Sequence, residues 1–312
     1  MLVLFLVTAL GLAGCVRVVD PVPLAAGPDS GFFFAGSVPT YGHPVSPAEH
    51  NRLAYLRALR RVDPCGLLTR ESLAKIGEIG AVGTMFAFDE CDVDIKMAGA
   101  TARRYISVAV ELSTLDHAAC QYVAPLLLSR LPGAPPLPGP VQPVLRITPI
   151  TDQPCDFADT VGRSTGPLPE ADRPPIRDGV GVYPVRLAER DPCEIVPTLS
   201  SARWDIGASR AHMCALTLTD GTAIRLTLQP QLFEPESDNR LRQSRDGVVA
   251  FVDTQLCAAS VFLGPPMLRK LLGGDYLQPG DVVIRPAVTV ESTPPRCGTV
   301  TGIAVAAAKL FG

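Results

Sequence analysis

The chain has 312 residues, which is long enough for two domains of ordinary size. Hydrophobic residues amount to 47% and charged residues to 19%, a composition typical of globular proteins and not of disordered chains. The formal net charge of −3 argues against a nucleic-acid partner, because surfaces that bind nucleic acid carry an excess of basic residues.

The N-terminal segment has the pattern of an export signal. Residues 2–14 are uncharged and, apart from Thr8, apolar, and the segment ends in Ala13-Gly14-Cys15. This run is shorter than the roughly 20 residues that a membrane-spanning helix needs. The junction resembles the lipobox of bacterial lipoproteins, in which the cysteine thiol carries a diacylglycerol and the chain is cut just before it. An ordinary signal peptide with a chance cysteine is the alternative.

The lipobox resemblance implies lipid attachment at Cys15, with acyl chains such as palmitate, and a mature chain on the extracytoplasmic face of the cell membrane. The membrane, reached through this anchor, is then a partner of the protein. No Lys or Arg lies between Met1 and Cys15, although export signals usually begin with positive charge, which leaves open a start of translation upstream of Met1.

The remaining cysteines are even in number, as expected for an exported chain with disulfide bonds. Removing Cys15 from the nine cysteines leaves eight, which predict four disulfides. These eight are Cys65, Cys91, Cys120, Cys155, Cys193, Cys214, Cys257 and Cys297. Oxidised in pairs, they are not available as metal ligands.

The cysteines occur in two similar sets of four. The segment Asp63–Leu68 begins Asp-Pro-Cys, and Asp191–Val196 begins in the same way. In each half the second cysteine opens an alternating strand pattern, Cys91–Met97 and Cys214–Leu218, and the fourth follows a proline or a proline pair closely. This recurrence indicates an internal duplication with one domain per copy. Two unrelated four-cysteine segments are the alternative.

If each half folds alone, its four cysteines allow three pairings. We favour the pairing of first with second and third with fourth, because each bond then closes a loop of a few tens of residues. Each such loop contributes roughly 3–4 kcal/mol in the chain-entropy model. The predicted bonds are Cys65–Cys91, Cys120–Cys155, Cys193–Cys214 and Cys257–Cys297.

Proline-rich and glycine-rich stretches mark the boundaries between segments. The predicted segments are a signal peptide at 1–15, a flexible tether at 16–45, a first domain at 46–165, a linker at 166–182 and a second domain at 183–312. Three consecutive phenylalanines, Phe32–Phe34, interrupt the tether, and we expect them to dock on a domain rather than to touch lipid.

In the first half, Ser46-Pro47-Ala48-Glu49 has the spacing of a capping box. It predicts a helix that begins there and runs toward Asp63. A short helix is expected at 69–76, with Gly77 as its C-cap. Strands are expected at 91–97, with Asp92 and Asp94 facing outward, and at 105–112. Residues 116–131 are expected to be helical.

In the second half, strands at 214–219 and 222–228 flank Asp220-Gly221, which predicts a hairpin with a type I′ turn. Residues 251–263 are expected to form a helix matching the one at 116–131. Pro286 makes 281–290 an edge strand, and 299–310 predicts a terminal helix. The resulting fold class is α+β, with two tandem disulfide-stapled domains, each of helices packed on a mostly antiparallel sheet.

The opening of the first half, Asp63-Pro64-Cys65-Gly66-Leu67-Leu68-Thr69, resembles that of an uncharacterised family of actinobacterial lipoproteins. The resemblance implies a lipobox, a proline-rich tether and a small two-disulfide α+β domain, similar in type to the extracellular sensor domain of a mycobacterial serine/threonine kinase. The second half departs from it, because Glu194–Pro197 replaces Leu-Leu-Thr. The family implies no catalytic residue and no ligand.

Residues capable of metal or acid–base chemistry do not form a recognisable motif. His43, His50, His117 and His212 lack the spacing of a zinc site, and we interpret them as surface or hydrogen-bonded core residues. Asp89, Glu90, Asp92 and Asp94 make an acidic cluster, interpreted as a solvated strand face and not as a calcium site. We therefore predict no metal and no cofactor.

Two serine-hydrolase patterns match in letters only. Gly162-Arg163-Ser164-Thr165-Gly166 has the nucleophile-elbow spelling, but following prolines forbid the required helix, so we predict a loop. Ser72-Leu73-Ala74-Lys75 and Ser237-Asp238-Asn239 match two β-lactamase elements, but no Lys-Thr-Gly follows. We interpret these matches as chance and expect no catalytic residue.

A single tryptophan and a group of arginines are the two remaining features that could take part in binding. Trp204, the only tryptophan, is interpreted as a core residue and alternatively as a stacking platform for a ligand. Arg57, Arg60 and Arg61 share a helix face, interpreted as solvated and alternatively as a contact with anionic lipid.

The sequence favours a cell-envelope lipoprotein of the non-enzymatic binding or accessory type, whose partner is an unknown envelope protein or ligand. A groove between two related domains is a usual place for its site. A carrier or sensor of an apolar envelope molecule, held under the helices, is one alternative. A cell-wall hydrolase is the other.

Overall fold

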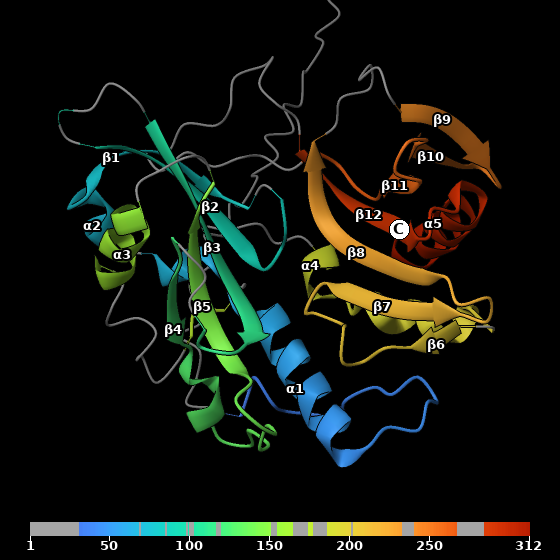
Figure 1. Cartoon of the computed structure of the whole chain (residues 1–312), viewed down its shortest axis with the longest axis horizontal. Coiled ribbons are helices and arrows are strands. Elements are labelled where there is room, and N and C mark those ends of the chain that lie inside the picture. The colour runs from blue at the N-terminus through green and yellow to red at the C-terminus, as the bar shows by residue number, and fades with distance from the viewer. Residues whose placement is uncertain are drawn as a thin grey trace, which may run out of the picture.

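A computed structural model describes residues 31–68, 70–84, 86–97, 99, 103–116, 120–150, 155–164, 174–176, 186–200, 202–232, 240–266 and 284–312. These residues form two antiparallel sheets with a small number of helices, which confirms the α+β class (Figure 1). The predicted leader, with Cys15, and most of the predicted linker lie outside the described residues.

The first half builds a five-stranded sheet in the order β1-β2-β3-β5-β4, with every neighbouring pair antiparallel. Its elements are α1 (Pro47–Arg61), the 3₁₀ turn η1 (Cys65–Leu67), α2 (Arg70–Ala74), β1 (Gly77–Gly83), β2 (Glu90–Met97), β3 (Arg103–Ser113), β4 (Tyr122–Pro125), the 3₁₀ turn η2 (Leu127–Arg130), β5 (Gln142–Pro149) and α3 (Cys155–Ser164).

The second half builds a seven-stranded antiparallel sheet in the order β6-β7-β8-β12-β11-β10-β9. Its elements are α4 (Arg186–Glu189), the 3₁₀ segment η3 (Pro192–Thr198), β6 (Ala202–Trp204), β7 (Met213–Leu218), β8 (Ala223–Leu232), β9 (Arg240–Arg245), β10 (Val248–Asp253), β11 (Ala258–Phe262), β12 (Ile284–Thr293) and α5 (Cys297–Phe311).

The two halves share one topology. The order β1-β2-β3-β5-β4 corresponds to β6-β7-β8-β12-β11, and the hairpin β9–β10 is an addition at the edge of the second sheet. A 3₁₀ segment precedes each sheet and a helix follows its last strand in both halves. This agreement supports the duplication inferred from the sequence.

The eight cysteines form the four predicted pairs, with Cα atoms 4.1 to 5.1 Å apart. The bonds occupy equivalent places in the two halves. In each half the first bond joins the 3₁₀ segment to the second strand of the sheet. The other bond joins a cysteine one or two residues before β4 or β11 to the first residue of the final helix. Cys120 and Cys257, which match in this comparison, both have positive φ, at 64° and 48°.

Helix α1 begins with the predicted capping box, in which the Ser46 hydroxyl accepts from the Glu49 N–H and the Glu49 carboxylate accepts from the Ser46 N–H. Its apolar residues divide between the two cores. Tyr55 and Leu59 pack in the core of the first half, whereas Leu56 packs in the core of the second. Helix α1 therefore lies against both sheets (Figure 1).

The segment at 31–45, placed in the tether by its composition, is packed on α1 and on the second half. Phe33 is buried at 5% exposure, as the docking prediction expected, and the Phe34 ring meets Tyr55 edge to face. The Arg57 guanidinium donates to the backbone carbonyls of residues 34, 36 and 37. Further on, the Tyr41 ring lies 5.7 Å from that of Trp204.

Two predicted helices are wrong. The segment predicted to be helical at 116–131 contains β4 and η2 in its described part, and the one at 251–263 contains the second half of β10 and all of β11. Both apolar runs are short, and periodicity does not separate a short buried strand from a buried helix. Tertiary pairing decides the outcome, since β4 joins β5 and β11 joins β12.

The predicted edge position of Pro286 is also wrong, because β12 lies between β8 and β11. Pro286 faces Pro230 of β8, and two facing prolines have no N–H groups to exchange. The pair must occupy a non-hydrogen-bonded position, so the ladder between β8 and β12 loses no bond there. Pairing of β12 with β11 starts only at Ala287.

Two local predictions need smaller corrections. The hairpin β7–β8 is present, but only Gly221 of its turn has positive φ, so the turn is not type I′. The Gly221 N–H donates to the Leu218 carbonyl and the Asp220 carboxylate accepts from the Thr222 N–H, which gives a longer loop with glycine at its left-handed position. Gly77 begins β1 and does not cap α2.

Candidate functional site

Each sheet has one face that helices cover and one that they do not. On β3 the core residues Ile106, Val108 and Val110 alternate with Ala109 and Glu111, which lie on the opposite face. The same alternation on β8 places Leu226 in the second core and its neighbours Arg225 and Thr227 on the opposite face.

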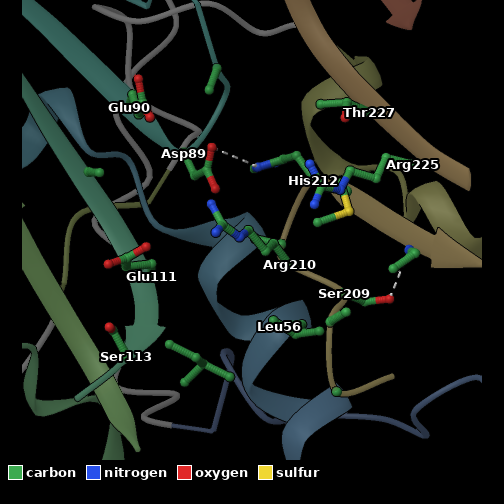
Figure 2. Close-up of a pocket in the computed structure, with 18 of the residues that line it drawn as sticks. Leu56, Asp89, Glu90, Glu111, Ser113, Ser209, Arg210, His212, Arg225 and Thr227 are labelled. Carbon is green, nitrogen blue, oxygen red and sulfur yellow. Dashed lines mark hydrogen bonds and ion pairs between the residues drawn. The ribbon is translucent and has the colours of Figure 1, made fainter. Parts of the chain in front are cut away.

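These uncovered faces border a cavity of about 620 Å³, called here the inter-half cavity (Figure 2). Helix α1 and the loop at 205–212 complete its lining. It is lined by Arg52, Leu56, Ala87, Asp89, Glu90, Ala109, Glu111, Leu112, Ser113, Gly207, Ala208, Ser209, Arg210, Ala211, His212, Met213, Ala215, Arg225, Thr227 and Glu291. This volume is within the usual range for a small-ligand site.

The wall contributed by the first half, called here the acidic wall, carries Asp89, Glu90 and Glu111. Asp92 and Asp94 continue the same strand face, and they are buried at 2% and 8% exposure. The prediction of a solvated acidic face is therefore wrong for these two residues. Alternating charged residues mark a solvated strand face only where no other part of the chain covers that face, and here both carboxylates are covered.

Glu90 is the carboxyl group of this wall with the most altered acidity. Burial, followed by the charges of Asp89 and Asp92, raises the pKa of Glu90 from its ordinary value of 4.5 to about 7. The Ser107 hydroxyl donates to its Oε2 atom over 3.2 Å and acts in the opposite direction. By contrast, Glu111 is bonded to Arg146, whose Nε lies 2.6 Å from Oε1.

The second half supplies a wall called here the basic wall, built on the loop at 205–212. Ser209 organises this loop, because its hydroxyl accepts from the Trp204 indole and the Ala215 N–H and donates to the Asp205 carbonyl. Arg52 of α1 donates to the carbonyls of Ile206 and Ser209 at 3.0 and 3.1 Å. The loop is thus held from within and from α1.

Arg210 and Arg225 bring positive charge to this wall, and both are exposed. Figure 2 shows the Arg210 side chain reaching from its loop toward Asp89 on the acidic wall. Arg225 of β8 lies directly across from Glu291 of β12 in the strand register. The second-half side therefore carries these two arginines and the Glu291 carboxylate, whereas the first-half side carries the carboxylates of the acidic wall and Arg52 of α1.

His212 joins the two walls. Its Nε2 atom lies 2.9 Å from the Ala188 carbonyl, and its Nδ1 atom lies 3.8 Å from Oδ1 of Asp89 (Figure 2). The ring is 2% exposed and packs edge to face with Phe88. Because a backbone carbonyl holds Nε2, the ring is fixed in position, which agrees with its interpretation as a hydrogen-bonded core histidine.

The other candidate residues lie outside this cavity. Trp204 is buried in the second core, as predicted, and His43 meets it edge to face. His50 is exposed on α1, and His117 lies outside the described residues. Cys15, the predicted lipid-attachment residue, also lies outside them.

The structure describes the first serine of each hydrolase pattern but not every element of these patterns. Ser72 belongs to α2, and Lys75 just beyond it forms an exposed ion pair with Glu71 at 3.2 Å. The Ser-Asp-Asn element at 237–239 lies outside the described part. Ser164 was predicted in a loop, but it ends α3 and its hydroxyl donates to the Val161 carbonyl. A helix thus precedes it where a nucleophile elbow needs a strand.

The arginine stripe on α1 is not the solvated face that its spacing suggested. Arg60 is 5% exposed, with Nη2 at 2.9 Å from Asp191 Oδ2 and Nη1 at 3.0 Å from the Ala211 carbonyl. Arg61 donates to the Phe32 carbonyl and lies over the Phe32 ring. These cations instead fasten the N-terminal segment and the second half to α1.

Sequence patterns drew attention to Asp89, Glu90 and His212 but did not indicate that the residues of the inter-half cavity lie together. Asp89 and Arg210 are 121 positions apart, and no local motif connects them. The only available signal was the position of both just before the second cysteine of their halves, Cys91 and Cys214. Equivalent places in duplicated units come together when the units face each other.

Searches for metal sites and membrane spans found none within the described ranges. Among these residues no group of three or more His, Cys, Asp or Glu side chains is placed to hold a metal ion. None of the helices that the structure describes is long and apolar enough to cross a bilayer. Comparison with protein-family models, curated proteins and solved structures gave no significant match.

Proposed function

We propose that this chain is a cell-envelope lipoprotein of the non-enzymatic binding type, attached to the extracytoplasmic face of the membrane through an acylated Cys15. The lipobox-like junction supports the anchor. Four disulfides support an oxidising location, since such bonds are rare in the cytosol. The likeness of the first-half opening to actinobacterial lipoproteins supports the same assignment.

The inter-half cavity is proposed as the binding site, and the observation that carries this proposal is its set of charged walls. Burying Glu90 and Asp89 beside one another is unfavourable, as the raised pKa of Glu90 indicates. Groups that destabilise a fold in this way commonly serve a function. The walls come from both halves, so a ligand here contacts both sheets.

A carrier of an apolar molecule is the second candidate, and a different cavity favours it. This cavity of about 470 Å³ lies at the end of α5 and is called here the α5-end cavity. Its lining is mostly apolar and includes Val249, Phe251, Phe262 and Leu263. Arg242 and Arg285 add positive charge beside the apolar side chains.

A cell-wall hydrolase has less support. Ser72 and Lys75, which carried that interpretation, do not line either cavity. Among the residues that line the inter-half cavity, Ser209 has a hydroxyl group that bonds Trp204, Asp205 and Ala215. A nucleophile needs a base within hydrogen-bond reach, and His212 of the same loop is bonded through Nε2 to the Ala188 carbonyl.

The anchor is tested by metabolic labelling with palmitate in an actinobacterial host. The expected result is a labelled protein in the membrane fraction, with both the label and the membrane association lost in Cys15→Ser. A labelled Cys15→Ser variant, or an unlabelled wild-type protein, would contradict the proposed anchor.

The binding site is tested by native mass spectrometry of the lipoprotein after incubation with a protein-free envelope extract. The variant Ala109→Trp fills the inter-half cavity, and Val249→Trp fills the α5-end cavity. We expect an added mass that disappears in Ala109→Trp and persists in Val249→Trp. The reverse pattern would transfer the function to the apolar carrier, and equal binding by all three proteins would refute both sites.

A further inference from the structure

The hairpin β9–β10 ends the second sheet and has no counterpart among the described strands of the first. Among the residues that the structure describes, β9 pairs with β10 and with no other strand (Figure 1). None of the residues of β9 is buried. The outer side of an edge strand presents a row of N–H and C=O groups to which another extended chain can add.

The turn of this hairpin determines which backbone groups of β9 face outward. Asp246 and Gly247 both have positive φ, at 51° and 79°, and they lie between the paired residues Arg245 and Val248. Two such residues form a type I′ turn, whose flanking pair exchanges hydrogen bonds. Because bonded and non-bonded pairs alternate along an antiparallel ladder, the backbone groups of residues 240, 242 and 244 point away from β10.

The side chains of β9 differ between its two faces. Leu241 lies directly across from Val252, whose side chain is in the second core, so Leu241 is on the core face of the sheet. Arg240 and Arg242, one position to either side, lie on the opposite face. A strand added beside β9 therefore meets an apolar side chain on one face and two arginines on the other.

A second apolar side chain lies at the same end of the sheet. Leu256 belongs to the loop between β10 and β11, and its N–H donates to Asp253, which is directly across from Arg240. Leu256 and Leu241, at 69% and 53%, are the two most exposed large apolar side chains of the described part. Exposed apolar groups gathered in one place mark an interaction surface.

The charge of β9 selects its partner. Two copies of β9 laid side by side would set arginine against arginine, which is unfavourable, whereas carboxylates on an added strand would be attracted. Arg242, which is exposed, is the principal cation for this contact. Arg240 also lies 3.0 Å from the Gln231 side-chain amide, and Arg245 lies against Gly302 of α5.

We propose that β9 is a docking strand for an extended segment of a partner protein, in which carboxylates and apolar side chains alternate. The segment adds antiparallel, as every neighbour in this sheet does. Its acidic residues lie directly across from Arg240 and Arg242 and exchange backbone hydrogen bonds with them, and its apolar residues cover Leu241. No residue of β9 lines the inter-half cavity, so this surface is separate from the proposed binding site.

Anionic lipid is the other partner that arginines beside exposed leucines attract. Lipid phosphates only accept hydrogen bonds, so they give no partner to the outward C=O groups of β9. An added strand supplies both donors and acceptors at the spacing of these groups. The backbone of β9 therefore favours a peptide.

The test is isothermal titration of the full-length lipoprotein in detergent with the peptide acetyl-Glu-Val-Glu-Val-Glu-Val-amide. In the proposed register the glutamate N–H groups donate to β9 and the valine N–H groups point away. N-methylation of the glutamates is therefore expected to weaken binding at least about tenfold, because several hydrogen bonds are lost. N-methylation of the valines is expected to leave the affinity unchanged. Equal affinities of the two methylated peptides, the reverse order, or no binding of the parent peptide at millimolar concentration would overturn the inference.

Two arginine variants test the charge of the surface. Arg242→Glu is expected to weaken the parent peptide about fivefold, since attraction becomes repulsion. Arg203→Glu is the matched control, because Arg203 is also exposed but belongs to β6 at the opposite edge of the sheet. It is expected to bind as the wild type does, and equal effects of the two variants would contradict the proposed surface.

Two further outcomes separate this inference from its alternatives. Displacement of the parent peptide by phosphatidylglycerol added to the micelles, with equal binding of both methylated peptides, would assign the surface to anionic lipid and overturn the inference. Ala109→Trp, which fills the inter-half cavity, is expected to bind the peptide as the wild type does. Loss of peptide binding in Ala109→Trp would place the peptide in that cavity and not on β9.

Discussion

The ion pair between Arg60 and Asp191 is a buried contact between α1 and the second half, and its removal gives a quantitative prediction. The two side chains are 6% and 14% exposed, and the guanidinium nitrogen lies 2.9 Å from the carboxylate oxygen. Breaking a buried pair by removing one partner costs about 3–5 kcal/mol, because the other charge stays in the interior.

We expect Arg60→Leu to fall at the lower end of this range, at about 3 kcal/mol. The Asp191 carboxylate keeps other partners, since its Oδ1 atom accepts from the Cys193 N–H at 3.0 Å and the Tyr41 hydroxyl also bonds this carboxylate. The variant also loses the bond from Arg60 to the Ala211 carbonyl. Urea unfolding followed by the fluorescence of Trp204, the only tryptophan, measures the effect with the disulfides intact.

A double-mutant cycle separates the pair from the packing of the Arg60 stem. Asp191→Asn keeps an N-cap side chain while removing the charge, so the combination with Arg60→Leu measures the coupling energy. Arg61→Leu is the matched control, because Arg61 bonds the Phe32 carbonyl and stacks over the Phe32 ring. An Arg60→Leu effect no larger than that of Arg61→Leu would refute the reasoning.

Three further predictions concern pH, packing and covalent stability. The pKa of Glu90 is about 7 in the folded protein and 4.5 ordinarily, so between these pH values the folded protein retains a proton that the unfolded chain releases. The free energy of unfolding therefore falls as pH rises from 4.5 to about 7. Glu90→Gln should reduce this dependence on pH when unfolding by urea is measured across the range. Phe33→Ala should lower the free energy of unfolding by about 3 kcal/mol, measured with urea. Phe32 is 44% exposed, so Phe32→Ala should lower it by less than about 1 kcal/mol. Equal losses for the two variants would contradict the packing of the segment at 31–45 on the folded protein. Replacing both Cys257 and Cys297 by Ala should cost about 2–5 kcal/mol, and an unchanged melting temperature would contradict the bond.

The disulfide framework could be predicted because the sequence repeats it. The two Asp-Pro-Cys openings divided eight cysteines into two sets, and this division reduced the possible pairings to a few. The hairpin at Asp220-Gly221 and the helix after Ser46 could also be predicted, because each is determined by side chains a few positions apart.

The strands β4, β10 and β11 could not be predicted with the same methods. Their apolar runs are short, and they become strands because neighbouring strands far along the chain pair with them. Pro286 can lie in a central strand because it faces Pro230, which is 56 positions away in the sequence. Neither proline has an N–H group, so neither needs a hydrogen bond from the other.

The candidate site depended entirely on how the halves meet. Asp92 and Asp94 alternate with apolar residues as solvent-facing side chains do, yet they are buried. Arg60 looks like a surface residue of an amphipathic helix, yet its partner Asp191 belongs to the second half. The contact between Arg60 and Asp191 joins residues 131 positions apart, so no local pattern could indicate it.

The central claim is that one ligand contacts both walls of the inter-half cavity, and hydrogen exchange of the lipoprotein with and without the envelope extract tests it most directly. The account predicts slowed exchange at 86–90 in the first half and, at the same extract concentration, at 205–213 in the second. Slowed exchange in only one of these segments, or only at 249–262 beside the end of α5, would contradict it.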